Sequence, residues 1–327
     1  MARKLVEIKG ITKEFPTGGG AFSKKGSAVV HAVTDVSLDV YEGETLGLVG
    51  ESGCGKSTLG RLILNLIPPT RGHVIFDGTD LQELSVEEMR KMRTRMQMVF
   101  QDPYASLNPR LSIHDIVAEP MTTHNYGTKE EITARVEELL RKTGIRPEFM
   151  YRYPHQFSGG QKQRVVIAMS LLCNPKLLIA DEPTTALDVT IQAQVLDIIN
   201  QLREQYKMAM VLITHDLGVV AETCDNVAIM YAGQIVEAGT VREVYLNPKH
   251  PYTRGLFDSI PKLDDDSTEL IPIEGAISNA PDLPTGCFFH PRCRYCQDIC
   301  KTQQPTVKGE GHKFMCHFDL FSKEEEK

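Results

Sequence analysis

The sequence predicts an α/β fold, built on a mostly parallel β-sheet with helices packed against it. The first observation is alternation: an apolar run at residues 177–180 precedes a helical pattern at 189–205, and a second apolar run follows at 210–214. Strands that alternate with helices favour a parallel sheet. The second observation is a glycine-rich stretch at residues 50–58, which lies between an apolar run and a helical pattern. That order is typical of the phosphate-binding edge of such a sheet.

The glycine-rich stretch has the sequence GESGCGKST and fits a phosphate-binding pattern, in which four residues separate a glycine from Gly-Lys-Ser. Its glycines let backbone N–H groups surround a phosphate, and the following helix presents the positive end of its dipole. We expect Lys56 to reach the β- and γ-phosphates of ATP and the Ser57 hydroxyl to hold Mg²⁺. A glycine turn that matches by chance is the alternative, and the flanking strand and helix patterns argue against it. The predicted nucleotide ligands are Gly50, Ser52, Gly53, Cys54, Gly55, Lys56, Ser57 and Thr58.

A second signal is the sequence LLIADEP, in which a buried strand ends in two adjacent acids, Asp181 and Glu182. An aspartate at the carboxyl end of a core strand can bind Mg²⁺ together with Ser57 and water. Glu182 can accept the proton of an attacking water or hold that water in line with the γ-phosphate. Two solvated loop acids are the alternative, which the nearby phosphate-binding pattern disfavours.

Bulk properties exclude several classes of protein. The net charge of −7 gives no global electrostatic reason to expect a nucleic-acid partner. No signal peptide opens the chain, and its most apolar stretch, residues 165–180, is interrupted by Asn-Pro-Lys and is too short to span a bilayer. Eight cysteines without a secretory signal indicate a reducing compartment, where cysteines are more often metal ligands than disulfides.

Between the two signals, residues 102–164 show helical patterns with polar breaks and predict an inserted helical subdomain. This segment ends in FSGGQKQR, residues 157–164. In that position the sequence resembles the ATP-binding subunit of an ABC transporter, and the resemblance extends from Leu5 to about Pro248. It implies an ABC-type P-loop NTPase with a RecA-like core, an antiparallel β subdomain and a helical subdomain, within residues 1–249.

The resemblance also implies roles for individual residues. Ser158, Gly159 and Gly160 match the signature that binds the γ-phosphate of the nucleotide held by the opposite subunit. Ser and Gly at a helix N-terminus offer N–H groups, a hydroxyl and a dipole end to such a phosphate. Two subunits would therefore enclose two ATP molecules head to tail. The remaining matches are Gln101 (Q-loop, a catalytic residue and Mg²⁺ ligand), Ala186, Leu187 and Asp188 (D-loop), His215 (switch histidine) and Phe15, in place of the tyrosine that stacks on adenine.

A narrower resemblance is to the ATPases of dipeptide and oligopeptide importers, carried by FQDPYASLNP, HPYTRGLFDSIP and GCFFHPRC. The long loop after Phe15 and GESGCGKSTLGR resemble the second of the two ATPase types in such importers. The family implies a heterodimer with a related ATPase, two transmembrane permeases and, indirectly, an extracytoplasmic binding protein. The chain would then lie at the cytoplasmic face of the membrane and reach it only through the permeases. Nickel or oligosaccharide import by a relative of the same family is the alternative. Soluble ABC proteins of translation or DNA repair fit less well, since one set of motifs and no long coiled coil are present.

The C-terminal segment, residues 250–327, is predicted to be an appended extension. Five of the eight cysteines lie between positions 287 and 316. In the peptide-importer ATPases that this sequence resembles, cysteines at the positions of Cys287, Cys293, Cys300 and Cys316 hold a 4Fe–4S cluster, which the segment 286–317 would then contain. Cys296 departs from that pattern. Thiolates suit zinc as well, with His290, His312 and His317 as further donors, and free thiols or a disulfide remain open. The metal would act as a structural staple, because the segment has few apolar residues for a core of its own.

Overall fold

The computed structural model describes residues 3–17, 28–185, 187–259, 273–275 and 283–321. The chain forms two compact units. The first comprises Met1–Val6, Val40–Thr45 and Phe76–Ile213, and the second comprises Glu7–Asp39, Leu46–Ile75 and Thr214–Lys327. Ala186 of the predicted D-loop and most of the loop after Phe15 lie outside the described residues.

The first unit is organised around parallel strands. β7 (Leu177–Asp181) pairs in parallel with β6 (Met96–Val99) on one side and with β8 (Ala209–Thr214) on the other. Every residue of β7 and β8 is buried, which explains why both read as continuous apolar runs. The strands predicted from these runs are therefore confirmed.

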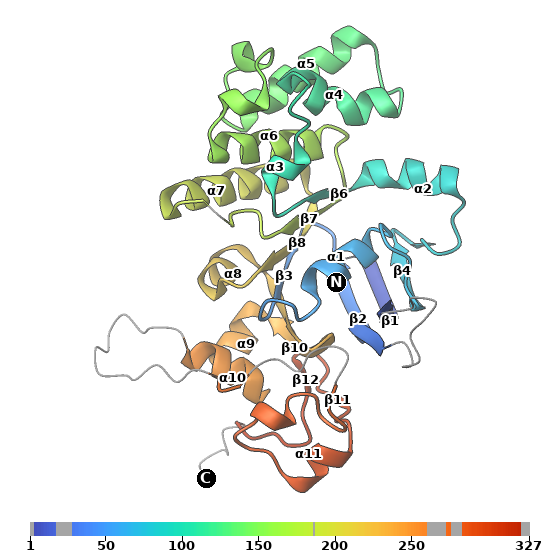
Figure 1. Cartoon of the computed structure of the whole chain (residues 1–327), viewed down its shortest axis with the longest axis vertical. Helices are drawn as coiled ribbons and strands as arrows, with labels where there is room; N and C mark the ends of the chain where they lie inside the picture. The colour runs from blue at the N-terminus through green and yellow to red at the C-terminus, as the bar shows by residue number, and fades with distance from the viewer. Residues whose placement is uncertain (1–2, 18–27, 186, 260–272, 276–282, 322–327) are drawn as a thin grey trace. The chain divides into compact units, whose positions relative to one another are not determined.

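Helices make up most of the rest of the first unit. α4 (Ile113–Thr123), α5 (Lys129–Lys142) and α6 (Gly159–Leu171) pack against one another (Figure 1). Their contact faces carry apolar side chains such as Val117, Val136 and Leu139, all of which are buried. α6 also packs against α7 (Val189–Tyr206) and α3 (Pro103–Ser106). The unit further contains α2 (Val86–Met92), β5 (Thr79–Asp80) and 3₁₀ turns at Arg93–Arg95, Pro147–Phe149 and Pro154–Gln156.

The second unit contains a mixed sheet that the extension completes. β3 (Thr45–Val49) runs parallel to β9 (Asn226–Tyr231), and β10 (Gln234–Thr240) pairs antiparallel with β9. The extension adds β12 (Lys313–Met315) antiparallel to β10, and β11 (Val307–Lys308) pairs with β12 (Figure 1). Most of three further strands also belongs to this unit: β1 (Lys4–Thr17), β2 (Ala28–Tyr41) and β4 (Arg71–Phe76), which neighbour one another in the order β2-β1-β4. The remaining elements are a 3₁₀ turn at His290–Arg292 and the helices α1 (Lys56–Ile63), α8 (Leu217–Thr223), α9 (Val241–Leu246), α10 (Pro251–Asp258) and α11 (Asp298–Thr302).

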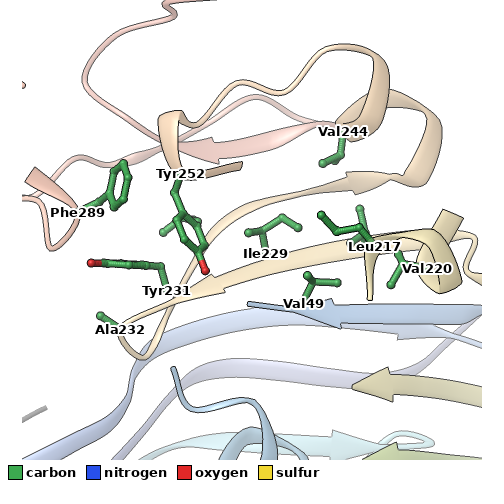
Figure 2. Close-up of a cluster of buried hydrophobic side chains, with 11 residues drawn as sticks. Val49, Leu217, Val220, Ile229, Tyr231, Ala232, Val244, Tyr252 and Phe289 are labelled. Carbon is green, nitrogen blue, oxygen red and sulfur yellow. The ribbon is translucent and has the colours of Figure 1, made fainter. Parts of the chain in front are cut away.

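A hydrophobic core joins the extension to this sheet. Tyr231 at the end of β9, Tyr252 on α10 and Phe289 in the extension pack together, with ring centroids 4.7 to 5.4 Å apart (Figure 2). Figure 2 shows this aromatic group beside the aliphatic residues Val49 and Ile229 of the adjacent strands. The extension therefore buries Tyr252 and Phe289 against the end of β9. Among the helices that the structure describes, none is both long and apolar enough to cross a membrane.

Candidate nucleotide site

The phosphate loop follows β3 directly and leads into α1, as the sequence predicts. Gly55 caps this helix with a φ of 108°, a left-handed conformation that favours glycine. A Cβ atom there would lie 2.3 Å from the carbonyl oxygen of Ala32, and one at Gly50 would lie 2.2 Å from that of Met230. Close backbone approach thus requires glycine at both positions, and at Gly55 the left-handed conformation requires it as well.

Lys56, the first residue of α1, is buried and turns back over the loop. Its Nζ donates hydrogen bonds to the carbonyl oxygens of Gly50 at 2.6 Å and of Glu51 at 2.9 Å. Its third contact is with Cys54 Sγ at 3.9 Å, so two backbone oxygens and a neutral sulfur hold the ammonium over the loop, where an anionic ligand can compete for it. Ser57 and Thr58 lie in the first turn of the same helix, whose N-terminal dipole end favours an anion.

The acidic pair lies at the end of β7 in the first unit. Asp181 is the last residue of the strand and is buried. Glu182 follows with a φ of 47°, a left-handed conformation that is strained for a residue other than glycine. Its carboxylate accepts hydrogen bonds from Gln101 Nε2 at 2.7 Å and from Thr185 Oγ1 at 2.9 Å. Such strain costs about 1–3 kcal/mol and clusters at functional sites.

The signature residues begin a helix of the same unit. Ser158 caps α6 in a reciprocal box with Gln161, in which each residue's side-chain oxygen accepts from the other's backbone N–H. Gly160 packs so closely that a Cβ there would lie 2.5 Å from Ile191 of α7. Asp188 caps α7 and accepts from the N–H of Ile191 at 3.0 Å. Ser158 and Asp188 are both exposed, so their side chains can reach a ligand or partner.

The last two predicted residues belong to the second unit. His215 is exposed and directly follows β8, next to Asp216, the N-cap of α8. Phe15 is 36% exposed, and the ammonium of Lys13 lies 5.0 Å from its ring centroid. Of the predicted catalytic residues, Gln101 and Glu182 are joined directly within one unit. The second unit also contains the loop residues from Gly50 to Thr58, together with Phe15 and His215. The first unit contains the other predicted residues, Ser158, Gly159, Gly160, Asp181 and Asp188.

The sequence did not reveal two residues that contact the phosphate loop, Tyr252 and Arg292, nor the loop residue Glu51 to which both are bonded. The backbone N–H of Glu51 donates to the Tyr252 hydroxyl at 3.0 Å. The Glu51 carboxylate forms a bidentate ion pair with Arg292, with N–O distances of 2.7 and 3.0 Å. Arg292 is 241 positions away in the sequence, and Glu51 occupies a variable position of the loop pattern. No local pattern could have linked them.

The iron–sulfur prediction is wrong. Within the ranges given above, no group of three or more Cys, His, Asp or Glu side chains could hold a metal ion, which also counts against zinc. Cys287, Cys293, Cys300 and Cys316 line a cavity of about 10 Å³, room for one water at most. Burial raises the pKa of Cys287 to about 11 and that of Cys293 to about 12, so both are neutral thiols. All eight cysteines are free.

The prediction failed because it assumed that the extension could not be ordered by polypeptide contacts. The N–H of Cys287 donates to the carbonyl oxygen of Cys300 at 2.8 Å, which closes the cysteine-bearing loop without a metal. Phe289 is 4% exposed and lies in the shared core. β12 adds backbone hydrogen bonding to the edge of β10.

Models of known protein families match two parts of the chain. A family model for ABC transporters matches residues 33–185, and one for the C-terminal region of oligopeptide/dipeptide transporters matches residues 236–300. The chain is 46% identical to the oligopeptide transport ATP-binding protein AppF of Bacillus subtilis (strain 168), over 96% of this chain and 97% of that protein. It is 43% identical to the dipeptide transport ATP-binding protein DppD of the same strain, over 96% and 94% of the two chains.

Solved structures confirm the predicted fold class. A dimeric ATP-binding cassette in a post-hydrolysis state, bound to ADP and Pi, is similar with a TM-score of 0.64 and 31% identity, over 72% of this chain and 99% of that one. A component of an ABC transporter complex from Clostridium perfringens has a TM-score of 0.62 and 28% identity, over 74% and 91% of the two chains. The chain belongs to the family of ATP-hydrolysing, ATP-binding subunits of oligopeptide and dipeptide ABC transporters.

Proposed function

We propose that this chain hydrolyses ATP to energise the import of dipeptides or oligopeptides, as the second of two ATPase types in an ABC importer. The observation that supports the catalytic role is the fixed position of the Glu182 carboxylate. It accepts hydrogen bonds from Gln101 and Thr185, and the backbone of Glu182 has a strained left-handed conformation. A carboxylate fixed in this way is suited to orient a water and accept its proton. The names of the relatives support the peptide substrate.

In the proposed site, Lys56 binds the β- and γ-phosphates and exchanges its backbone partners for them. The oxygen donors Ser57, Asp181 and Gln101 suit Mg²⁺, which favours carboxylate and hydroxyl ligands. The ion would neutralise charge on the phosphates. Phe15, half-exposed beside Lys13, stacks on the adenine, and His215 contacts the γ-phosphate.

Assembly follows from the signature. Ser158, Gly159 and Gly160 bind the nucleotide held by a related ATPase, and Asp188 couples the two sites. This partner, two permeases and, indirectly, an extracytoplasmic binding protein complete the proposed importer, which places this chain peripherally at the cytoplasmic face of the membrane. Within the chain, we assign residues 1–249 to the ATP-binding part, with the helical subdomain at 102–164, and residues 250–327 to the extension.

The test is a reconstituted complex of this chain with its partner ATPase, permeases and binding protein in lipid vesicles. Glu182→Gln keeps the side-chain shape and its ability to accept from Gln101 but removes the charge that polarises water. We expect ATP to bind normally, ATP turnover to fall at least about a hundredfold, and uptake of a labelled dipeptide to stop. Glu130→Gln, on the exposed first turn of α5, is the matched control and should behave as wild type.

Two outcomes contradict the proposal in different parts. Turnover above roughly a third of the wild-type rate in the Glu182→Gln complex would remove Glu182 as the base. ATP-dependent uptake of nickel or an oligosaccharide but of no peptide would leave the ATPase assignment in place and replace the substrate.

A further inference from the structure

Glu51 of the phosphate loop is held from three sides, and two of these contacts come from the C-terminal extension. Its N–H donates to the Tyr252 hydroxyl, its carboxylate pairs with Arg292, and its carbonyl oxygen accepts from Lys56. All four residues lie in the second unit. The extension therefore contacts the same loop residue that helps to hold the nucleotide-binding lysine.

Arg292 is arranged as a fixed contact rather than a surface ion pair. Its side chain is only 5% exposed, whereas most exposed pairs contribute little because water screens them. The guanidinium also donates from Nε to the carbonyl oxygen of Glu274 at 3.0 Å and lies 5.7 Å from the ring centroid of Tyr231. Hydrogen bonding to Glu51 raises the pKa of Arg292, so its charge is constant at every working pH.

The backbone that carries Arg292 is itself anchored in the core. Arg292 ends the short 3₁₀ turn that follows Phe289, and Phe289 packs edge-on against Tyr231 and Tyr252. Tyr252 is fully buried, and burial raises the pKa of its phenol, so the hydroxyl stays neutral and accepts the Glu51 hydrogen bond. A rigid aromatic cluster thus carries both groups that hold Glu51.

We propose that Arg292 and Tyr252 are positioning residues for ATP binding, through which the extension fixes the phosphate loop in its binding conformation. Neither residue needs to touch ATP. Without the ion pair, Glu51 and its carbonyl oxygen gain conformational freedom, and Lys56 loses a fixed backbone partner. ATP binding must then order the loop itself, which lowers the net free energy of binding. The inference rests on the proposed role of Lys56 and assigns the extension a part in the same site.

The experiment measures the Kd for ATP and the kcat at saturating ATP of the full-length chain in the assembled complex. We expect Arg292→Gln to raise the Kd about tenfold, the lower range for loss of a hydrogen bond to a charged group. The kcat should change less than about twofold, because the chemistry lies at Glu182. Arg292→Lys keeps the charge without the bidentate geometry and should recover part of the affinity. Arg254→Gln, whose arginine pairs with Asp258 on the exposed side of α10, is the matched control and should leave the Kd unchanged.

A double-mutant cycle decides whether Arg292 acts through Glu51. If it does, Glu51→Gln combined with Arg292→Gln should raise the Kd no further than the larger single effect. Independent, multiplying effects would overturn the proposal, as would an unchanged Kd in Arg292→Gln or an equal rise in Arg254→Gln. Tyr252→Phe, which removes only the hydroxyl, should raise the Kd about threefold, and it serves as the test if Arg292→Gln does not fold. Failure of the wild-type chain to bind ATP, or normal affinity in Lys56→Ala, would instead reject the proposed function.

Discussion

The phosphate loop and the C-terminal extension meet at Glu51, yet their order has different origins. The loop is ordered locally: glycines at fixed spacing allow close backbone approach, and the start of α1 follows within the same nine residues, 50–58. The extension is ordered by contacts with residues far away in the sequence, above all the aromatic cluster of Tyr231, Tyr252 and Phe289. A locally ordered segment has a motif that can be recognised in the sequence. A segment ordered by distant contacts has no such motif, and only its amino-acid composition can be read.

Buried polar contacts of Glu237 also attach the extension to the sheet. Glu237 on β10 is 1% exposed, and its carboxylate accepts from the N–H groups of Lys249 and His250, at 2.7 and 2.8 Å, and contacts His312 at 2.6 Å. A buried carboxylate is costly unless several donors satisfy it. Glu237 thus ties the chain before α10 and the loop before β12 to the same strand.

The largest expected effect tests whether the extension shares one core with the sheet. Phe289→Ala should lower the free energy of unfolding of the whole second unit by about 3–5 kcal/mol, the usual cost of a cavity of this size. Phe288→Ala, at a half-buried neighbouring position, should cost clearly less. The measurement is urea unfolding, followed both by a probe in the extension and by ATP-dependent protection of the phosphate loop. Unfolding of the extension alone, with the loop transition unmoved, would show that the extension is an independent module.

The core strands, the phosphate loop and the acid pair could be predicted from the sequence because each depends on neighbouring residues. Residues 177–180 form a buried parallel strand because they are uniformly apolar, and Glu182 is recognisable because it follows that strand. The hydrogen bond from Gln101 to Glu182 joins residues 81 positions apart and appears only in the fold.

The extension marks the limit of that approach. Cysteine spacing led to a metal centre because the sequence gives no sign that Phe289 fits between Tyr231 and Tyr252. The two strands β11 and β12 contain only two and three residues, too few for an alternating pattern to be recognised. The role of Arg292 could not be predicted for the same reason, since its partner Glu51 lies 241 positions away in the sequence.

An intermediate effect concerns pH and the buried His250. Burial lowers the pKa of His250 to about 4 from an ordinary value of 6.5, and its Nδ1 accepts from the N–H of Tyr252. Above the ordinary pKa, the folded and unfolded states are both neutral at this residue. As the pH falls below that value the unfolded state takes up a proton that the folded state does not, so stability is lost with falling pH. We expect this residue to cost about 2 kcal/mol of stability at pH 5 relative to pH 7.5.

His250→Asn isolates this contribution, because asparagine also caps a helix but does not titrate. The difference in unfolding free energy between wild type and variant should change by that amount between the two pH values, whatever the variant's stability at neutral pH. A constant difference would mean that His250 titrates normally in the folded chain and that the polar contacts around Glu237 are open to water.

The smallest effect separates the local role of a motif residue from its proposed functional role. Ser158 and Thr240 both cap a helix in a reciprocal box, with Gln161 and Glu243 respectively, but only Ser158 belongs to the signature. Ser158→Ala and Thr240→Ala should each cost about 1 kcal/mol of stability, the ordinary price of a lost N-cap. Only Ser158→Ala should also lower ATP turnover in the complex, because its hydroxyl is proposed to bind the nucleotide of the partner ATPase. Equal turnover in both variants at matched stability would reduce Ser158 to a helix cap, and it would leave the backbone N–H groups at the start of α6 as the only contribution of the signature to phosphate binding.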